Sequence, residues 1–364
     1  MAMSVDTSGW TWWFDAQAFL NHNNQWRRFR DFHVLESQNW FMLDAGRKVG
    51  RGRLTVHGMF SLEPWTVRGY GSPQVFQTGE TYANAALVDY QHPHDLVMEA
   101  SVQFDWPLNA KWTLHLGGGP VDSPALGPPV FMHRASAEAN PTAPLTHHML
   151  DSTHITHGVI TVGVSRGSFL VEGSAFHGRE PDEDRVAIEF GPLDSYSGRL
   201  TWLRGRWQAQ VSAAHVKFPD KTEFSDHEMI TASVSYTGEW LGRPLAFTGA
   251  YGRTREPGTG RVTPGGLLEG AYHLTSRDLI YTRGELMIKD ILTLGGYHPP
   301  GFTHPHILSK VGALTVGYER QLLRNRIGHL GVGADGTLYY RDVNLYDGYG
   351  DPSSAHFFLR YRFR

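Results

Sequence analysis

The stretch Trp10-Thr-Trp-Trp-Phe-Asp-Ala-Gln-Ala-Phe-Leu20 alternates between two kinds of side chain. Every even position from Trp10 to Leu20 is apolar, whereas odd positions such as Asp15 and Gln17 are polar. Successive side chains of a β-strand point to opposite faces, so the stretch predicts a strand with one apolar face and one mixed, polar face. Such a strand fits either a sandwich or a barrel.

The same period of two recurs along the whole chain, while runs with the helical period are short. We therefore predict an all-β protein with about sixteen antiparallel strands. The predicted strands are about 10–21, 38–47, 53–63, 95–106, 111–118, 157–166, 168–177, 196–204, 206–216, 227–238, 244–253, 265–275, 278–289, 308–321, 326–341 and 353–364.

The predicted connections alternate between short turns, such as Arg166-Gly167 and Arg204-Gly205, and long loops. In an antiparallel sheet, this alternation places every long loop on one side and every short turn on the other. No linker or low-complexity block divides the chain, so we expect one domain over residues 1–364.

This architecture resembles the bacterial outer-membrane β-barrels, which have an even number of strands, short periplasmic turns and long outer loops. The last strand also resembles that of the class, although its aromatic residue, Phe363, is penultimate. The resemblance implies a transmembrane antiparallel β-barrel in the bacterial outer membrane, surrounded by lipid, in which the long loops 64–94 and 119–156 can fold into the lumen. Many barrels of this width form trimers, so a homo-oligomer is one of the assemblies that the resemblance allows. Aromatic residues near strand ends suit the interfacial girdles of such barrels: Trp10, Trp12, Trp106, Trp112, Trp202, Trp207, Tyr236, Trp240 and Tyr361.

Composition excludes several other classes of protein. The chain has no Cys, which rules out disulfides and thiolate metal sites. Its net charge of −3 argues against a nucleic-acid-binding protein. No repeat of propeller length is present, and no apolar run reaches the length of a transmembrane helix. The N-terminus shows no signal-peptide pattern, so we expect any export signal in a precursor.

The predicted inner face carries charges of both signs, which suit either a charge-lined pore or ion pairs across the barrel. We predict a channel for passive diffusion of small hydrophilic solutes or ions. The predicted pore-lining residues are Arg53, Glu99, Asp105, Arg199, Arg283, Glu285, Glu319, Arg341, Arg360 and Arg362.

The 20 histidines concentrate in the long loops, in three runs. Imidazole and carboxylate ligands suit Zn, Cu, Ni or Fe, so a metal-binding or metal-transport function is the first alternative. None of the runs matches a stereotyped zinc signature, and hydrogen-bonded loop histidines or a pH-responsive loop gate stay open as interpretations. The predicted metal ligands are His92, His94, His147, His148, Asp151 and His154, and a third run contains His298, His304 and His306.

An outer-membrane hydrolase is the second alternative. Ser152 lies two residues from His154, but neither a GxSxG motif nor an oxyanion element accompanies the pair. We therefore predict that the chain is not an enzyme, assign no catalytic residue and require no cofactor other than the metal ion of the first alternative.

Overall fold

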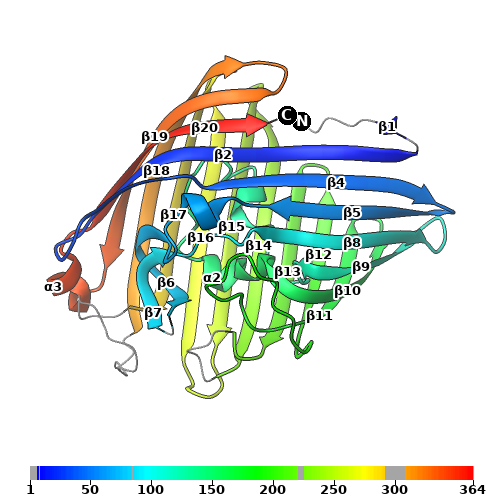
Figure 1. The fold of residues 1–364 in the computed structure, drawn as a ribbon, viewed down its shortest axis with the longest axis horizontal. Coiled ribbons are helices and arrows are strands. Elements are labelled where there is room, and N and C mark those ends of the chain that lie inside the picture. The colour runs from blue at the N-terminus through cyan, green and yellow to red at the C-terminus, as the bar shows by residue number, and fades with distance from the viewer. Residues whose placement is uncertain (1–5, 8, 84, 220–224, 292–307, 364) are drawn as a thin grey trace.

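The computed structural model describes residues 6–7, 9–83, 85–219, 225–291 and 308–363, which form a closed antiparallel β-barrel (Figure 1). Sixteen long strands form the wall. They are β2 (Trp10–Trp26), β4 (Asn39–Val49), β5 (Gly52–Phe60), β8 (Val97–Pro107), β9 (Trp112–Asp122), β10 (Thr156–Arg166), β11 (Phe169–Phe176), β12 (Ser195–Arg204), β13 (Trp207–Val216), β14 (His227–Trp240), β15 (Arg243–Arg255), β16 (Val262–His273), β17 (Asp278–Asp290), β18 (Leu308–Arg324), β19 (Gly328–Arg341) and β20 (Ser353–Phe363). The sequence prediction of an all-β, sixteen-stranded barrel is confirmed.

The barrel closes because its first and last long strands pair with each other. β2 and β20 are antiparallel, with a register that runs from Gln17 opposite Arg362 to Trp26 opposite Ser353. Two short strands complete the sheet, since β1 (Asp6–Thr7) and β3 (Phe32–Glu36) both pair with β2. Closure leaves no free sheet edge, which is the condition for a sheet in lipid.

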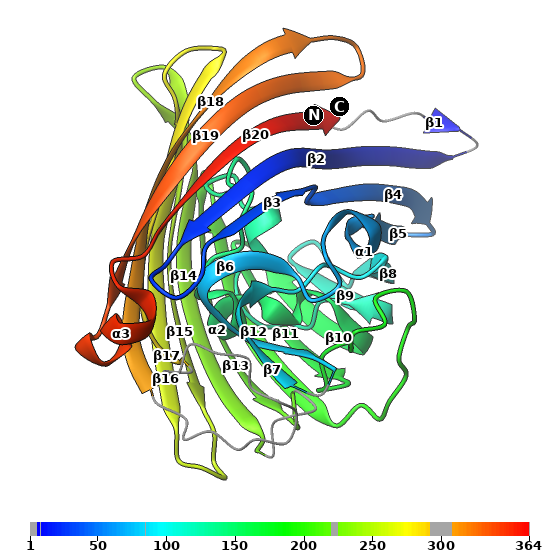
Figure 2. The ribbon, with the colours of Figure 1, turned by 60° about the vertical axis from the view of Figure 1, so that its left-hand side comes forward.

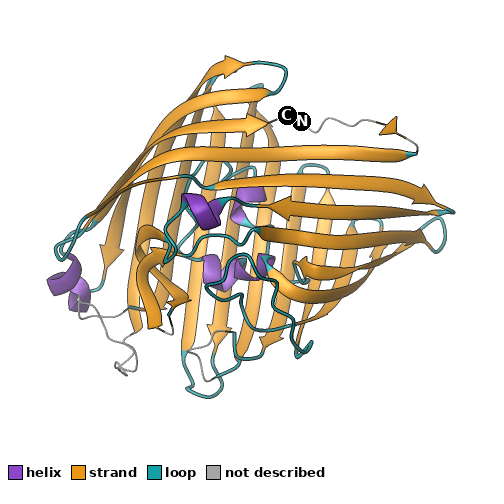
Figure 3. Cartoon of the chain, in the orientation of Figure 1, coloured by secondary structure: helices purple, strands orange, loops and turns teal. Residues whose placement is uncertain are grey.

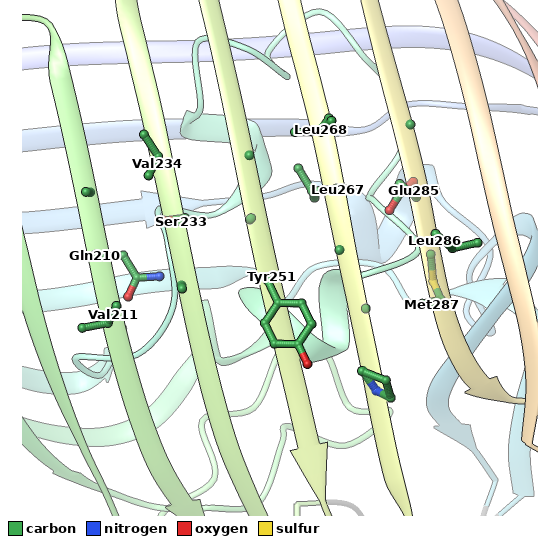
Figure 4. A pocket seen from close by; sticks show the side chains of 18 of the residues that line it. Gln210, Val211, Ser233, Val234, Tyr251, Leu267, Leu268, Glu285, Leu286 and Met287 are labelled. Atoms are coloured by element: carbon green, nitrogen blue, oxygen red, sulfur yellow. The ribbon is translucent and has the colours of Figure 1, made fainter.

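The two faces of the wall have opposite polarity. Outward side chains such as Leu268 and Leu338 are 73% and 70% exposed, whereas inward Thr231 and Glu269 are 0% and 3% exposed. Figure 4 shows side chains of both faces on adjacent strands, among them Tyr251 and Leu267. The groove in this part of the wall is lined by small residues such as Gly266 as well as by large apolar side chains. A soluble barrel has the reverse arrangement, so this wall is built to face lipid outside and polar groups inside.

Aromatic side chains gather at the short-turn end of the wall, as the sequence analysis predicts. The Trp207 ring lies 5.0 Å from that of Tyr236 and 5.5 Å from that of Phe247, and the Trp240 ring lies 5.5 Å from that of Tyr272. Aromatic rings are favoured at the level of the lipid headgroups, so these residues mark one membrane interface.

Tight turns join strands at this end, and long connections join them at the other. Gly167 and Gly205 adopt positive φ angles of 57° and 62°, a conformation that glycine tolerates best. Short helices occur in the long connections: α1 (Glu63–Thr66), η1 (Phe131–His133), α2 (His147–Leu150), η2 (Ser152–His154), η3 (Val343–Leu345) and α3 (Tyr346–Tyr349). Among the described residues, no helix is long and apolar enough to cross a membrane.

Two of the long connections lie inside the barrel (Figures 2 and 3). One contains the luminal hairpin, which we define as β6 (Ser72–Tyr82) and β7 (Ala85–Gln91). The other is the inserted segment, defined as residues 123–155, which contains η1, α2 and η2. The barrel interior is therefore occupied by chain rather than by an unobstructed channel.

Candidate functional site in the barrel lumen

The inserted segment crosses the lumen and is fastened to strands on opposite sides of the wall. Since the wall presents polar side chains inward, these can bind backbone groups of a segment that has little regular structure. The wall contacts include Ala125 N to Ser174 Oγ (2.8 Å), Gly127 N to Ser212 Oγ (2.9 Å), Ser136 Oγ to Thr248 Oγ1 (2.8 Å), Arg283 to Thr142 O (3.0 Å) and Gln17 Nε2 to Glu138 O (3.0 Å).

Arg134 is the central charged anchor of the inserted segment. Its guanidinium donates to the carboxylate of Asp151 and, at 2.6 Å, to Oε1 of Glu269 on β16. Arg283 on β17 donates to the second oxygen of Glu269 at 3.1 Å. All four side chains are nearly inaccessible to solvent, so these ion pairs act in a medium of low dielectric.

The charge state of Asp151 follows from this network. Burial raises the pKa of Asp151, but the positive charge of Arg134 and the contact with His147 outweigh burial and hold this pKa at about 2. The carboxylate is therefore ionised at neutral pH and accepts hydrogen bonds from both partners. The carboxylates of Glu269 and Asp151 in turn raise the pKa of Arg134, against the effect of burial.

Besides Arg283, four predicted pore-lining residues hold the inserted segment. Glu285 accepts hydrogen bonds from N and Oγ1 of Thr146, both at 3.0 Å. Arg360 donates to the Glu138 carbonyl at 2.9 Å, and Arg362 binds the Glu138 carboxylate. Arg199 donates to the carbonyl of Gly127 at 3.3 Å, as well as to Glu172. That these side chains also line the path of a solute stays a prediction.

The other predicted pore-lining residues also lie on wall strands and have local partners. Arg283 belongs to the Arg134 network described above. The remaining contacts are Arg53 over the Trp13 ring (4.8 Å), Glu99 with Ser101 (2.9 Å), Asp105 with His115 (2.7 Å), Glu319 with Arg360 (2.8 Å) and Arg341 with Asp351 (2.9 Å).

The luminal hairpin is docked through an apolar core. The buried Phe76 ring lies 5.7 Å from that of Tyr339 on β19 and 4.6 Å from that of Tyr349 on α3. Asp89 of the hairpin forms an ion pair with Arg27 and accepts a hydrogen bond from the Tyr349 hydroxyl at 3.1 Å. Burial raises the pKa of Tyr349 to about 12, so its hydroxyl stays protonated at neutral pH.

A cavity of about 600 Å³ lies between the luminal hairpin, α2 and the inner wall. Arg261 in its lining forms ion pairs with Glu256 and Asp290. The cavity is large enough for a small hydrophilic solute and carries both signs of charge. Its ionisable lining residues are His148, Glu180, His227, Glu256, Arg261, Lys289 and Asp290.

The structure brings three of the predicted metal ligands together. The His154 ring lies 5.4 Å from the His94 ring and 5.3 Å from the His147 ring. Asp151 does not join them as a free carboxylate, because it binds Arg134 and His147. Within the described residues, no three His, Asp or Glu side chains yet surround a common point in metal-binding geometry.

The remaining predicted ligands lie at the edges of this cluster. His148 faces the 600 Å³ cavity, 3.9 Å from Glu180, and its ring is 5.4 Å from that of His147. His92 lines a separate, smaller cavity together with His94. The third histidine run, His298, His304 and His306, lies outside the described residues.

One partner of this cluster was missed by the sequence analysis. Oε2 of Glu63 accepts hydrogen bonds from both the backbone N and the Nδ1 of His94, each at 2.9 Å. The two residues are 31 positions apart, so no local spacing links them.

The hydrolase alternative gains no support from Ser152. His154 donates from Nδ1 to the Asp151 carbonyl at 2.9 Å rather than pairing with this hydroxyl. His115 does bind Asp105 at 2.7 Å and Ser165 at 2.8 Å, on three adjacent strands. The inner wall repeats its His–Asp pairing at His57–Asp44 and His356–Asp335, which is typical of cross-strand polar pairs rather than of one distinct site.

The closed sixteen-stranded wall, its apolar outer face and its segment-filled lumen define the class: the protein is a β-barrel with the fold of the outer-membrane porins. It is similar to the outer-membrane channel DcaP of Acinetobacter baumannii, with 12% identity, a TM-score of 0.57 and full coverage of both chains. An anion-selective porin from Comamonas acidovorans matches with 12% identity and a TM-score of 0.56, over 97% of this chain and 100% of the porin.

The outer-membrane protein OmpT of Vibrio cholerae matches with 10% identity and a TM-score of 0.55, over 99% of this chain and 100% of OmpT. A trimer form of OmpT matches with a TM-score of 0.52 and 9% identity, over 96% of this chain and 99% of that one. No protein-family model and no curated protein sequence matches the chain. At such low identity, these likenesses establish the fold.

Proposed function

We propose that the protein is a channel of the bacterial outer membrane for small hydrophilic solutes or ions, narrowed by the inserted segment and the luminal hairpin. The observation that carries the proposal is the way the inserted segment is held. Hydrogen bonds and ion pairs with inward polar side chains fasten it to the wall, beside apolar contacts, and a cavity of about 600 Å³ with charged residues of both signs in its lining stays next to it. A lumen of this kind admits water and small solutes while limiting their size.

Conductance in planar lipid bilayers tests the proposal directly. We expect the folded protein to give small, discrete conductance steps. Thr263→Trp places a large ring in the cavity that Thr263 lines, and we expect it to lower the conductance of each step. Leu268→Trp on the same strand points outward into lipid and is the matched control. The channel proposal would be refuted if no conductance step appears in the wild type or in Arg134→Met, a variant that loses the central ion pairs of the inserted segment.

We also propose that the barrels associate as a homo-oligomer. The support is the trimer form of Vibrio cholerae OmpT, which shares the fold. Light scattering of the detergent-solubilised protein measures the mass of protein in each particle, apart from the bound detergent. A protein mass equal to one chain at all detergent concentrations would contradict this proposal.

A further inference from the structure

Three loop histidines use the same ring nitrogen for hydrogen bonding. Nδ1 of His94 lies 2.9 Å from Oε2 of Glu63, Nδ1 of His147 lies 2.7 Å from Oδ1 of Asp151, and Nδ1 of His154 lies 2.9 Å from the Asp151 carbonyl. Carboxylate and carbonyl oxygens only accept hydrogen bonds, so each Nδ1 carries the proton. In a neutral ring this leaves the lone pair on Nε2, the nitrogen through which such rings bind metals.

This shared tautomer is not a general property of the nearby histidines. His157, three residues after His154, accepts a hydrogen bond at Nδ1 from the backbone N of Glu189 at 2.9 Å. Its proton is therefore on Nε2 when the ring is neutral. The contrast separates His157 from the three clustered rings.

The separation of the rings matches shared coordination. When two imidazoles bind one tetrahedral ion through nitrogen at about 2.0–2.1 Å, their ring centres lie about 5 Å apart. His154 lies 5.4 Å from His94 and 5.3 Å from His147, so both measured pairs have this spacing. Because the three side chains do not surround one point in this structure, binding requires the two chain segments and their rings to shift toward one another while the Nδ1 contacts are kept.

We propose that His94, His147 and His154 bind one transition-metal ion, zinc or copper(II), through their Nε2 atoms. The support is the common tautomer, the ring spacing and Nε2 of His154, which is inaccessible to solvent and has no hydrogen-bond partner in the described residues. A buried lone pair without a donor is unfavourable, and a cation satisfies it.

Glu63 and Asp151 act in this site as positioning residues. A carboxylate that accepts a hydrogen bond from Nδ1 orients the ring and makes Nε2 a stronger ligand. Asp151 is in turn held by Arg134, which connects the site to Glu269 on the wall. The proposed set differs from the sequence prediction, because Asp151 supports a ligand instead of binding the ion, and His92 and His148 are not ligands.

The three ligands come from two different parts of the chain. His94 follows the luminal hairpin, whereas His147 and His154 belong to the inserted segment. A bound ion therefore joins the connection that carries the hairpin to the inserted segment, and we expect it to stabilise both inside the lumen. The site does not depend on channel activity, so loss of conductance and loss of metal binding are separable results.

Calorimetric titration of the full-length, detergent-folded protein with Zn(II), and separately with Cu(II), tests the site after treatment with a chelator. We expect binding of one ion per chain by at least one of these metals. His154→Ala and His94→Ala should each weaken it at least tenfold, and Asp151→Asn should weaken it by about 10- to 100-fold. Electron paramagnetic resonance of the Cu(II) form should show nitrogen ligands, with fewer in His154→Ala.

Matched variants separate the three rings from the wider histidine runs. His177→Ala, at a loop histidine that contacts the Pro192 carbonyl, should leave the affinity unchanged. Heat-modifiable migration on unboiled gels verifies that each variant is folded. If His154→Ala does not fold, His154→Gln takes its place. The proposal is overturned if neither metal binds stoichiometrically, if His154→Ala binds as tightly as the wild type, or if His92→Ala and His148→Ala weaken binding as much as His154→Ala.

Discussion

Replacing Arg134 by methionine removes the charged anchor of the inserted segment while keeping much of the side-chain volume. The carboxylate of Asp151 then loses its guanidinium partner, although it retains the contact with His147. Glu269 retains Arg283 and Ser136. Removing one partner of a buried ion pair costs about 3–5 kcal/mol, because it leaves buried negative charge that the remaining contacts compensate only in part.

Such a loss acts on the docked state of the inserted segment, since the wall is held by its own strand pairing. A cost of about 3–5 kcal/mol raises the ratio of undocked to docked segment by roughly two to four orders of magnitude. We therefore expect Arg134→Met to show larger conductance steps or more frequent openings in planar bilayers, and faster proteolytic cleavage within residues 123–155.

Two controls make this experiment decisive. Arg320→Met removes an exposed ion pair with Asp278 at the short-turn end, and such a pair contributes at most about 1 kcal/mol, so conductance should not change. Adding Ser136→Cys and Thr248→Cys, whose side-chain oxygens lie 2.8 Å apart in the wild type, should restore the small steps under oxidising conditions only. Wild-type conductance and proteolysis in Arg134→Met would refute the assigned anchoring role.

Three further variants test other parts of the structure. Leu268→Lys on the lipid-facing side of β16 should destabilise the folded barrel in vesicles by about 2–4 kcal/mol, measured by urea unfolding, while Val343→Lys in an outer loop should not. Glu285→Gln weakens the two hydrogen bonds from Thr146 and should increase proteolysis of the inserted segment less than Arg134→Met does. Tyr349, with a pKa of about 12 in the fold against 10 in an unfolded chain, stays protonated between these pH values while the unfolded state ionises. Folding stability should therefore fall above pH 10 by up to about 2–3 kcal/mol more in the wild type than in Tyr349→Phe, and equal losses in urea unfolding would contradict this.

The sequence analysis succeeded where the signal is local. Alternation from Trp10 to Leu20 requires only neighbouring positions, and each of the sixteen predicted strands corresponds to one wall strand. The polar face of the wall could also be assigned, because a strand in lipid must turn its apolar side chains outward. Boundaries moved most at the long-loop end of the wall, as in β2, which continues to Trp26.

The candidate site was only partly predictable, because its contacts join residues far apart in the chain. The spacing of His147 and Asp151 is local, and both were selected as ligands. The role of Asp151 depends instead on Arg134, and the orientation of His94 depends on Glu63, 31 positions earlier. The metal ligands predicted from loop composition therefore included the three clustered histidines. The sequence could not separate these three from His92 and His148.

By itself, the sequence determined the strands, their approximate number and the grouping of the long loops on one side, because period-two alternation and loop lengths are properties of short stretches. The closed membrane barrel followed from the resemblance of that pattern to outer-membrane barrels. Only the tertiary structure decided how the lumen is filled. The inserted segment has little regular structure, so its path depends on which inward side chains of distant strands satisfy its backbone and charges. In the path that the segment takes, Glu285 and Arg360 hydrogen-bond to it, and His94, His147 and His154 lie close together.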